Sequence, residues 1–166
     1  MFNLMGLCAS SRTTNPLAEA EAEAAAARGE VRVPEDCATL QEAVDRVHGD
    51  DRLTTIVVGK GKHRIKDVIP GTTLVVSYLM ISSAMNIVGD PGVPKSKIVV
   101  LCGIAFNYGI QGNCHLQHLT LRKAKGCGVR GSSSFTMEDV IVELCGVHGV
   151  YASGGASTIG TGGVGR

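Results

Sequence analysis

A stretch of 21 residues is written twice in succession, and this repeat constrains the fold more than any other feature of the chain. The first copy reads LQHLTLRKAKGCGVRGSSSFT and the second, which follows directly, reads MEDVIVELCGVHGVYASGGAS. Apolar residues of the two copies coincide at Leu116 and Met137, Leu119 and Val140, and Leu121 and Val142. A period this short predicts a stacked array in which each repeat buries its apolar face only against its neighbours.

The alternation inside each copy indicates what the stacked unit is. Apolar residues alternate with polar ones over only a few positions, which favours short strands, and Gly126, Gly128 and Gly131 would break a helix. Two or three short strands in 21 residues describe one coil of a parallel β-helix, whose coils stack at the ordinary strand spacing of ~4.8 Å. Leu119 and Val140 are therefore expected to lie above one another inside the coil.

The same register can be carried one coil earlier. Asn86-Ile87-Val88 then matches His118-Leu119-Thr120, and Gly109-Ile110-Gln111-Gly112 matches Gly128-Val129-Arg130-Gly131. This match places Asn86, His118 and Asp139 in one column at the bend between two strands. We expect structural hydrogen bonds there rather than catalysis.

Several segments resemble the pectin-lyase-like superfamily of right-handed parallel β-helices, in particular its generic carbohydrate-binding and sugar-hydrolase repeats. The segments are Ala38-Thr39-Leu40-Gln41-Glu42-Ala43-Val44, Thr55-Ile56-Val57-Val58 and Asn86-Ile87-Val88-Gly89-Asp90. The resemblance covers about residues 31 to 157 and implies a helix that caps the coil. It says little about activity, because one fold hosts many unrelated chemistries.

Composition limits the classes of partner. The formal net charge is +1, with no long basic run, so nucleic acid is not expected, and no apolar segment is long enough to span a membrane. The six cysteines form no Cys-x-x-Cys pair, which argues against a zinc site, and we expect free thiols that fill coil positions. Unpaired thiols and the lack of a clear signal peptide favour an intracellular location. No cofactor and no metal is predicted.

The N-terminal half divides into an extension and the start of the coils. Asn15-Pro16 opens an Ala/Glu segment that ends at Arg28-Gly29 and predicts a marginal helix, either a solvated linker or a docking helix for a partner. Thr39-Leu40-Gln41-Glu42 is a capping box at the start of a helix that we expect to plug the coil. Residues 59–64, which read GKGKHR, are interpreted as a solvated basic turn.

The candidate ligand-binding residues follow from the register. Gln111, Arg130 and Tyr151 are the outward neighbours of inward Ile110, Val129 and Val150, so they form a vertical stripe. A sugar could hydrogen-bond to the amide and the guanidinium and lie on the tyrosine ring. The stripe holds no carboxylate pair to serve as general acid and base or to bind a cation, so no catalytic residue is assigned.

The sequence therefore predicts an all-β fold: an extension over residues 1–30, a short right-handed parallel β-helix over 31–157 and a Gly-rich tail over 158–166. The favoured function is a non-catalytic structural or interaction module, as a subunit of a larger assembly, with a protein partner at the uncapped C-terminal end or on the N-terminal helix. Two alternatives stay open: a carbohydrate-binding module, and a fragment of a polysaccharide lyase or glycoside hydrolase.

Overall fold

The chain folds mostly into short parallel strands that form three sheets. In the computed structural model, the described residues are 16, 20, 23–24, 27–65, 67–68, 75–76, 78–153 and 160–161. The first sheet has the order β1-β2-β7-β10-β13-β16, the second β14-β11-β8-β3 and the third β15-β12-β9-β6. All strand pairs within these three sheets are parallel, and β4 (Asp67–Val68) and β5 (Val75–Val76) form a separate antiparallel pair.

The strand bounds are as follows. The first sheet comprises β1 (Glu30–Val33), β2 (Thr55–Val58), β7 (Asn86–Gly89), β10 (Cys114–Gln117), β13 (Phe135–Glu138) and β16 (Gly160–Thr161). The second comprises β3 (Gly61–His63), β8 (Ile98–Val100), β11 (Thr120–Arg122) and β14 (Ile141–Glu143). The third comprises β6 (Tyr78–Ile81), β9 (Gly103–Phe106), β12 (Val129–Gly131) and β15 (Val150–Ala152).

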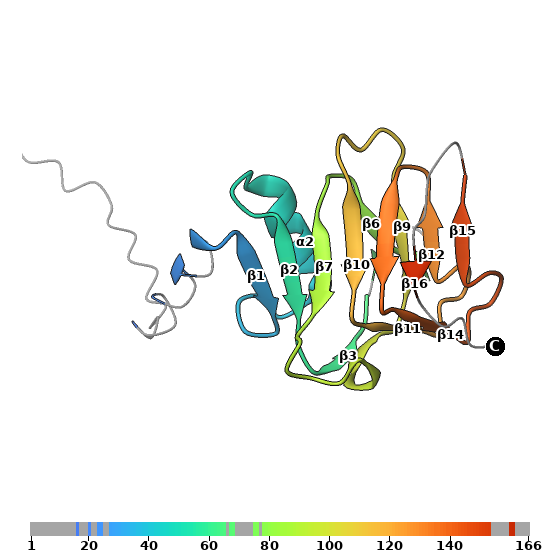
Figure 1. Ribbon diagram of the computed structural model, residues 1–166, viewed down its shortest axis with the longest axis horizontal. Helices are drawn as coiled ribbons and strands as arrows, with labels where there is room; N and C mark the ends of the chain where they lie inside the picture. Colours follow the sequence, from blue (N-terminus) through green and yellow to red (C-terminus); the bar gives the residue numbers. More distant parts are fainter. Residues whose placement is uncertain are drawn as a thin grey trace, which may run out of the picture.

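The chain visits the three sheets in a fixed order, so each turn of the chain is laid against the previous one (Figure 1). β7, β8 and β9 form one such turn, β10, β11 and β12 the next, and β13, β14 and β15 the one after that. We call each of these turns a coil. Apolar side chains from all three sheets meet in one core between them.

The 21-residue register of the two copies is confirmed. Leu121 pairs with Val142 in the second sheet, and Val129 pairs with Val150 in the third. The Ile141 backbone N–H donates to the Leu119 carbonyl at 3.0 Å, so the corner between the sheets keeps the same register. The repeat in the sequence therefore reports the stacking of these two coils.

The register extended one coil earlier is wrong. Asn86 pairs with His115, not with His118, and Val129 pairs with Ile104, not with Ile110. The coil that begins at Asn86 is longer than 21 residues because it carries loops between its strands. Its aliphatic residues therefore fall at other offsets from those of the following copies.

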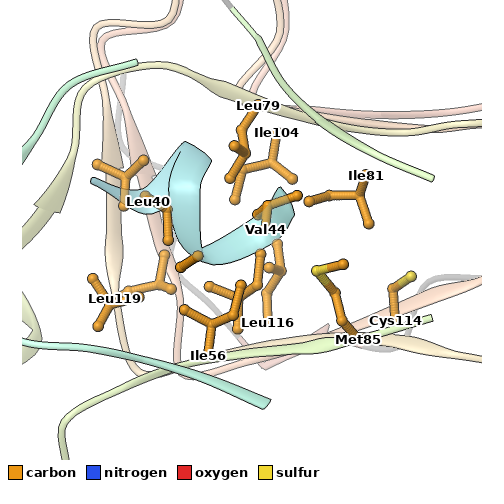
Figure 2. Close-up of a cluster of buried hydrophobic side chains, with 14 of the residues drawn as sticks. Leu40, Val44, Ile56, Leu79, Ile81, Met85, Ile104, Cys114, Leu116 and Leu119 are labelled. Atoms are coloured by element: carbon orange, nitrogen blue, oxygen red, sulfur yellow. The ribbon is translucent and has the colours of Figure 1, made fainter. Parts of the chain in front are cut away.

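One helix, α2 (Leu40–Gly49), covers the core next to β1 and β2. The Thr39 hydroxyl accepts the Glu42 backbone N–H at 3.2 Å, and the Glu42 carboxylate accepts the Ala38 N–H at 3.0 Å, which satisfies N-terminal donors as the predicted capping box does. Leu40 and Val44 lie on the buried face of the helix, among the side chains of the coils (Figure 2). The predicted helix is confirmed, and its apolar face packs on the core.

Other predictions have mixed outcomes. The basic segment 59–64 is not merely a turn, because β3 lies within it and pairs with β8. Strand pairing reaches Gly160–Thr161, inside the segment predicted as a tail, because β16 pairs with β13. Residues 16, 20, 23, 24 and 27 are helical and exposed, whereas the rest of the predicted Ala/Glu helix lies outside the described residues.

The cysteines of the described chain act largely as predicted. Cys37 and Cys114 are buried free thiols, Cys127 and Cys145 are half-buried free thiols, and Cys102 is buried. Burial raises the pKa of the Cys114 thiol, which keeps it in its less reactive protonated form. Cys8 lies outside the described residues.

Candidate functional site

The outer face of the third sheet carries a hollow of about 190 Å³. Its walls come from three strands and the loop that follows β9. Its lining includes the side chains of Tyr78, Met80, Asn107, Tyr108, Arg130 and Ser132. We call this feature the third-sheet hollow.

The floor of the third-sheet hollow belongs to a column of outward side chains, of which Met80, Ala105 and Arg130 line the hollow and Tyr151 follows Arg130 outside the lining. Strand pairing stacks Met80, Ala105, Arg130 and Tyr151 in that order. Met80 is 40% exposed and Tyr151 44%, whereas Ala105 is almost covered. Because alanine ends at its methyl group, the column is low between Met80 and Arg130, and the surface is hollowed there.

One wall is fixed by Tyr78. Its hydroxyl accepts the backbone N–H of Cys127 at 2.7 Å, so the side chain reaches from β6 to the loop that precedes β12. A Cβ at Gly103 would lie 2.6 Å from the Tyr78 ring, and one at Gly126 would lie 2.1 Å from its hydroxyl oxygen. The ring can occupy this place only because both positions are glycine.

The opposite wall is the loop after β9. The Asn107 side-chain amide donates to the Ser82 hydroxyl at 2.8 Å, and the Ser133 hydroxyl donates to the Asn107 carbonyl at 2.7 Å. Ser133 also accepts the Ile110 backbone N–H at 3.2 Å. These bonds hold the start of the loop in place, while the next side chain, Tyr108, is 86% exposed.

Arg130 gives the third-sheet hollow its charge. In contrast to Arg122, which pairs with Glu143, Arg130 forms no ion pair with any described residue. Arg130 is exposed and is the direct cross-strand neighbour of Tyr151. A planar group with five N–H donors is therefore presented to solvent next to aromatic side chains.

Of the three residues predicted as a binding stripe, the structure brings two together. Arg130 and Tyr151 are cross-strand neighbours, as predicted. Gln111 is not in the stripe, because Ala105 takes its expected place beside Arg130. Gln111 lies in an exposed loop, where its amide bonds at 3.5 Å to the carbonyl of Gly109. Gly109 and Gly112 have positive φ, which is typical of a turn and not of a ladder strand.

The predicted polar column at the bend is right for two of its three members. His118 and Asp139 are hydrogen-bonded, with His118 Nδ1 2.8 Å from Asp139 Oδ2. Asn86 is not in this column, and its amide donates instead to the Thr55 hydroxyl at 3.3 Å. His118 Nε2 lies 2.9 Å from the Val93 carbonyl oxygen, so the predicted bond to the backbone is present.

The acidic side chains of the two repeats are engaged between coils. Glu143 pairs with Arg122, and Glu138 accepts a hydrogen bond from the Gln117 amide at 3.4 Å. Neither is among the residues that line the third-sheet hollow. Within the described residues, no group of three or more His, Cys, Asp or Glu side chains is placed to hold a metal ion.

Sequence reasoning missed Tyr78, Asn107, Tyr108 and Ser132. A usable signal was present, because Gly103-Ile104 repeats the glycine-aliphatic pair Gly128-Val129. The same pair occurs again at Gly109-Ile110, and the predicted register matched Gly128-Val129 to this second pair instead of to Gly103-Ile104. Tyr78 could not have been found from spacing, because its role depends on Gly103 and Gly126.

No protein-family model matches this chain, and no curated protein or solved structure does either. Within the described residues, no helix has both the length and the apolar character needed to cross a membrane. The functional assignment therefore rests on the geometry of the site.

Proposed function

We propose that this chain is a short right-handed parallel β-helix of the pectin-lyase-like kind, and that it is a non-catalytic module that binds a saccharide in the third-sheet hollow. The observation that carries this proposal is that one hollow is lined by the exposed Tyr108 ring and by Arg130, which has no ion pair among the described residues, with Tyr151 next to Arg130 in the strand pairing. The recurrence of three parallel strands per coil supports the proposed fold.

Saccharide recognition needs a flat apolar surface and several directional polar groups. Tyr108 offers a ring in the lining on which the C–H face of a pyranose can lie, and such a ring loses little side-chain entropy on binding. Tyr151, beside Arg130, has one ring face stacked on His148 and can offer only the other. Arg130 donates hydrogen bonds to ring hydroxyls or to a carboxylate, and Ser132 and Asn107 add further polar groups. The three kinds of contact converge within one hollow.

The lining favours binding over hydrolysis. Glycoside hydrolases place two carboxyl groups about 5–9.5 Å apart on either side of the scissile bond. The described lining of the third-sheet hollow contains neither Asp nor Glu. It therefore supplies polar contacts without a general acid and a general base.

A glycan array followed by calorimetric titration tests the proposal. Arg130→Ala should weaken binding of a captured glycan by roughly ten- to hundredfold, because a hydrogen bond to a charged group contributes about 1.5–3 kcal/mol. Tyr108→Ala should weaken it by up to roughly tenfold, because a stacking ring contributes about 0.5–1.5 kcal/mol. Arg64→Ala and Gln111→Ala are matched controls, because both residues are exposed and lie outside the lining.

Unchanged affinity in Tyr108→Ala and Arg130→Ala would refute the site. The appearance of new reducing ends or of an unsaturated product during incubation would refute the non-catalytic assignment instead. The two outcomes are distinguishable because the first is measured as affinity and the second as turnover.

A second candidate, an interaction module, is favoured by one observation. Leu144 and Val147, on the connection between β14 and β15, are 54% and 65% exposed. β14 and β15 are also the outermost strands of their sheets in the described chain, and such edges can pair with a strand from a partner. Val147→Asp should abolish any concentration-dependent association seen by sedimentation, and Gln111→Asp is a control that adds the same single negative charge at another exposed position.

A further inference from the structure

The loop between β7 and β8 lies on the outer face of the second sheet. It contains the 3-10 turn η1 (Lys95–Lys97), which contacts β8 and β11. The Thr120 hydroxyl donates to the Lys95 carbonyl at 2.9 Å, and Thr120 is only 1% exposed although it lies outside the apolar core. Val99, its neighbour in the strand pairing, is also buried outside the core cluster. The loop thus covers a part of the sheet that would otherwise face solvent.

His118 links this loop to the turn between β13 and β14, with one ring nitrogen facing each. Nε2 lies 2.9 Å from the Val93 carbonyl oxygen, and Nδ1 lies 2.8 Å from Asp139 Oδ2. A carbonyl oxygen and a carboxylate oxygen accept hydrogen bonds but donate none. Both ring nitrogens must therefore carry a proton to make both bonds, which is the cationic imidazolium form.

We propose that His118 is a pH-dependent latch, which in its protonated form holds the loop of residues 91–97 against the second sheet and in its neutral form releases it. A neutral ring has a single N–H and can bond either Val93 or Asp139, but not both. Release uncovers Thr120 and Val99. The latch lies on a different sheet from the third-sheet hollow and does not depend on saccharide binding.

The charges around the ring come from both elements packed on it. Asp139 belongs to the turn between β13 and β14, and its other carboxylate oxygen pairs with the Lys95 ammonium of η1. The hydrogen bond to Asp139 and then the bond to the Val93 carbonyl raise the pKa of His118, whereas burial and the Lys95 charge act weakly in the opposite direction. The attraction is stronger than the opposing effects, so the net shift is upward.

The sign of the pH dependence follows from that upward shift. A histidine whose pKa is higher in the folded than in the unfolded protein contributes its full stabilisation below the unfolded value, about 6.5. The contribution falls as pH rises through the folded pKa. The latch is therefore closed below the unfolded pKa of about 6.5 and opens as pH rises through the raised pKa of the folded protein.

Two substitutions keep the backbone while changing the latch. His118 and Asp139 have φ of 54° and 52°, a left-handed conformation that asparagine tolerates better than most residues. His118→Asn removes the titrating ring, and Asp139→Asn removes the carboxylate that favours its charged form. His115→Gln is the matched control, because His115 lies in β10 and its ring bonds the Thr136 hydroxyl at 2.6 Å instead of the loop.

Ring-proton NMR and amide hydrogen exchange test the latch in the full chain. The His118 titration midpoint should lie above 6.5 in the wild type and fall in Asp139→Asn. The Lys97 N–H, which bonds the Pro94 carbonyl within the loop, should exchange roughly three- to tenfold faster in His118→Asn than in the wild type at pH 5.5, given the usual net strength of one partly exposed hydrogen bond. At pH 9 the two rates should converge.

Several results would overturn the proposal. One is a wild-type midpoint at or below 6.5, and another is a Lys97 exchange ratio that stays the same from pH 5.5 to pH 9. A third is His115→Gln changing the ratio as much as His118→Asn does. If His118→Asn failed to fold, the shift of the His118 midpoint in Asp139→Asn would decide the matter alone.

Discussion

Gly131 and Phe135 allow a quantitative test of how tightly the Phe135 ring packs against the backbone at position 131. The Phe135 ring is fully buried and stacks on Phe106 with ring centroids 5.0 Å apart. A Cβ added at Gly131 would lie 2.1 Å from an atom of the Phe135 ring, and its three nearest neighbours all belong to that ring. The ring therefore occupies the space that a side chain at position 131 would need.

The single substitutions should both destabilise the fold. Phe135→Ala should lower the free energy of unfolding by about 3–5 kcal/mol, because it leaves a cavity and removes an aromatic pair. Gly131→Ala should cost about 1–2 kcal/mol, since overpacking costs about 1–3 kcal/mol and a less flexible unfolded chain returns about 0.4–1 kcal/mol. The larger loss is a considerable share of the roughly 5–15 kcal/mol typical of a domain.

The double variant should be more stable than the sum of the two losses predicts. Once the ring is gone, the methyl group at position 131 meets no clash and only the gain in the unfolded state remains. We expect a coupling energy of about 2 kcal/mol between the two positions. Gly49→Ala is the control, because a Cβ at Gly49 has nothing within 4 Å, and it should be additive with Phe135→Ala.

Urea denaturation followed by circular dichroism measures each free energy, with Phe135→Leu as a milder substitute if Phe135→Ala is largely unfolded in water. Strict additivity of Gly131→Ala and Phe135→Ala would mean that the two side chains do not share one space. The stacking of the last coils described above would then be wrong.

Three further predictions concern the corners and faces of the coils. Val140 is 2% exposed, so Val140→Asp should bury an unpaired charge and leave the chain unfolded in thermal melts. Arg130→Ala, on the outer face, should change the free energy of unfolding by less than about 0.5 kcal/mol. Equal effects of the two substitutions would contradict the assignment of Val140 to the inside and Arg130 to the outside. Leu144 has φ of 54° and is 54% exposed, so Leu144→Asn should stabilise the fold by about 0.5–1 kcal/mol in urea titrations, while Val147→Asn should be near neutral. Hydrogen bonds from Lys95 and then from His118 lower the pKa of Asp139 in the folded protein. The contribution of Asp139 to stability is therefore present above pH 3.8 and is lost as pH falls through the lowered pKa of the folded state. An NMR titration of this carboxyl group that shows no downward shift would contradict the prediction.

The sequence predicted the fold best where the coils are shortest. Leu121 and Val142 could be aligned because no insertion separates the two copies. Between Asn86 and His115 the chain inserts two loops, so the period is lost although the strands still stack. The sequence of segment 59–64 predicts a turn because β3 is only three residues long and shows no apolar alternation. Its place in the second sheet depends on pairing with β8.

The candidate site was predictable only in part for a related reason. Arg130 and Tyr151 share a position within the exact repeat, so their proximity follows from the period alone. Tyr108 and Asn107 belong to an insertion, which has no counterpart in the next copy. The contribution of Tyr78 arises between coils, where glycine at positions 103 and 126 makes room for a ring from a third strand.

The loop of residues 107–113 shapes one wall of the third-sheet hollow without pairing in any sheet. Its replacement therefore need not disturb the ladders that hold the coils together. Such a segment could be exchanged as a cassette, with Asn107 and Ser133 kept as the anchoring joint. A library of loops inserted at this position would vary the ligands that the hollow can bind, while the stacked strands that carry the loop stayed unchanged.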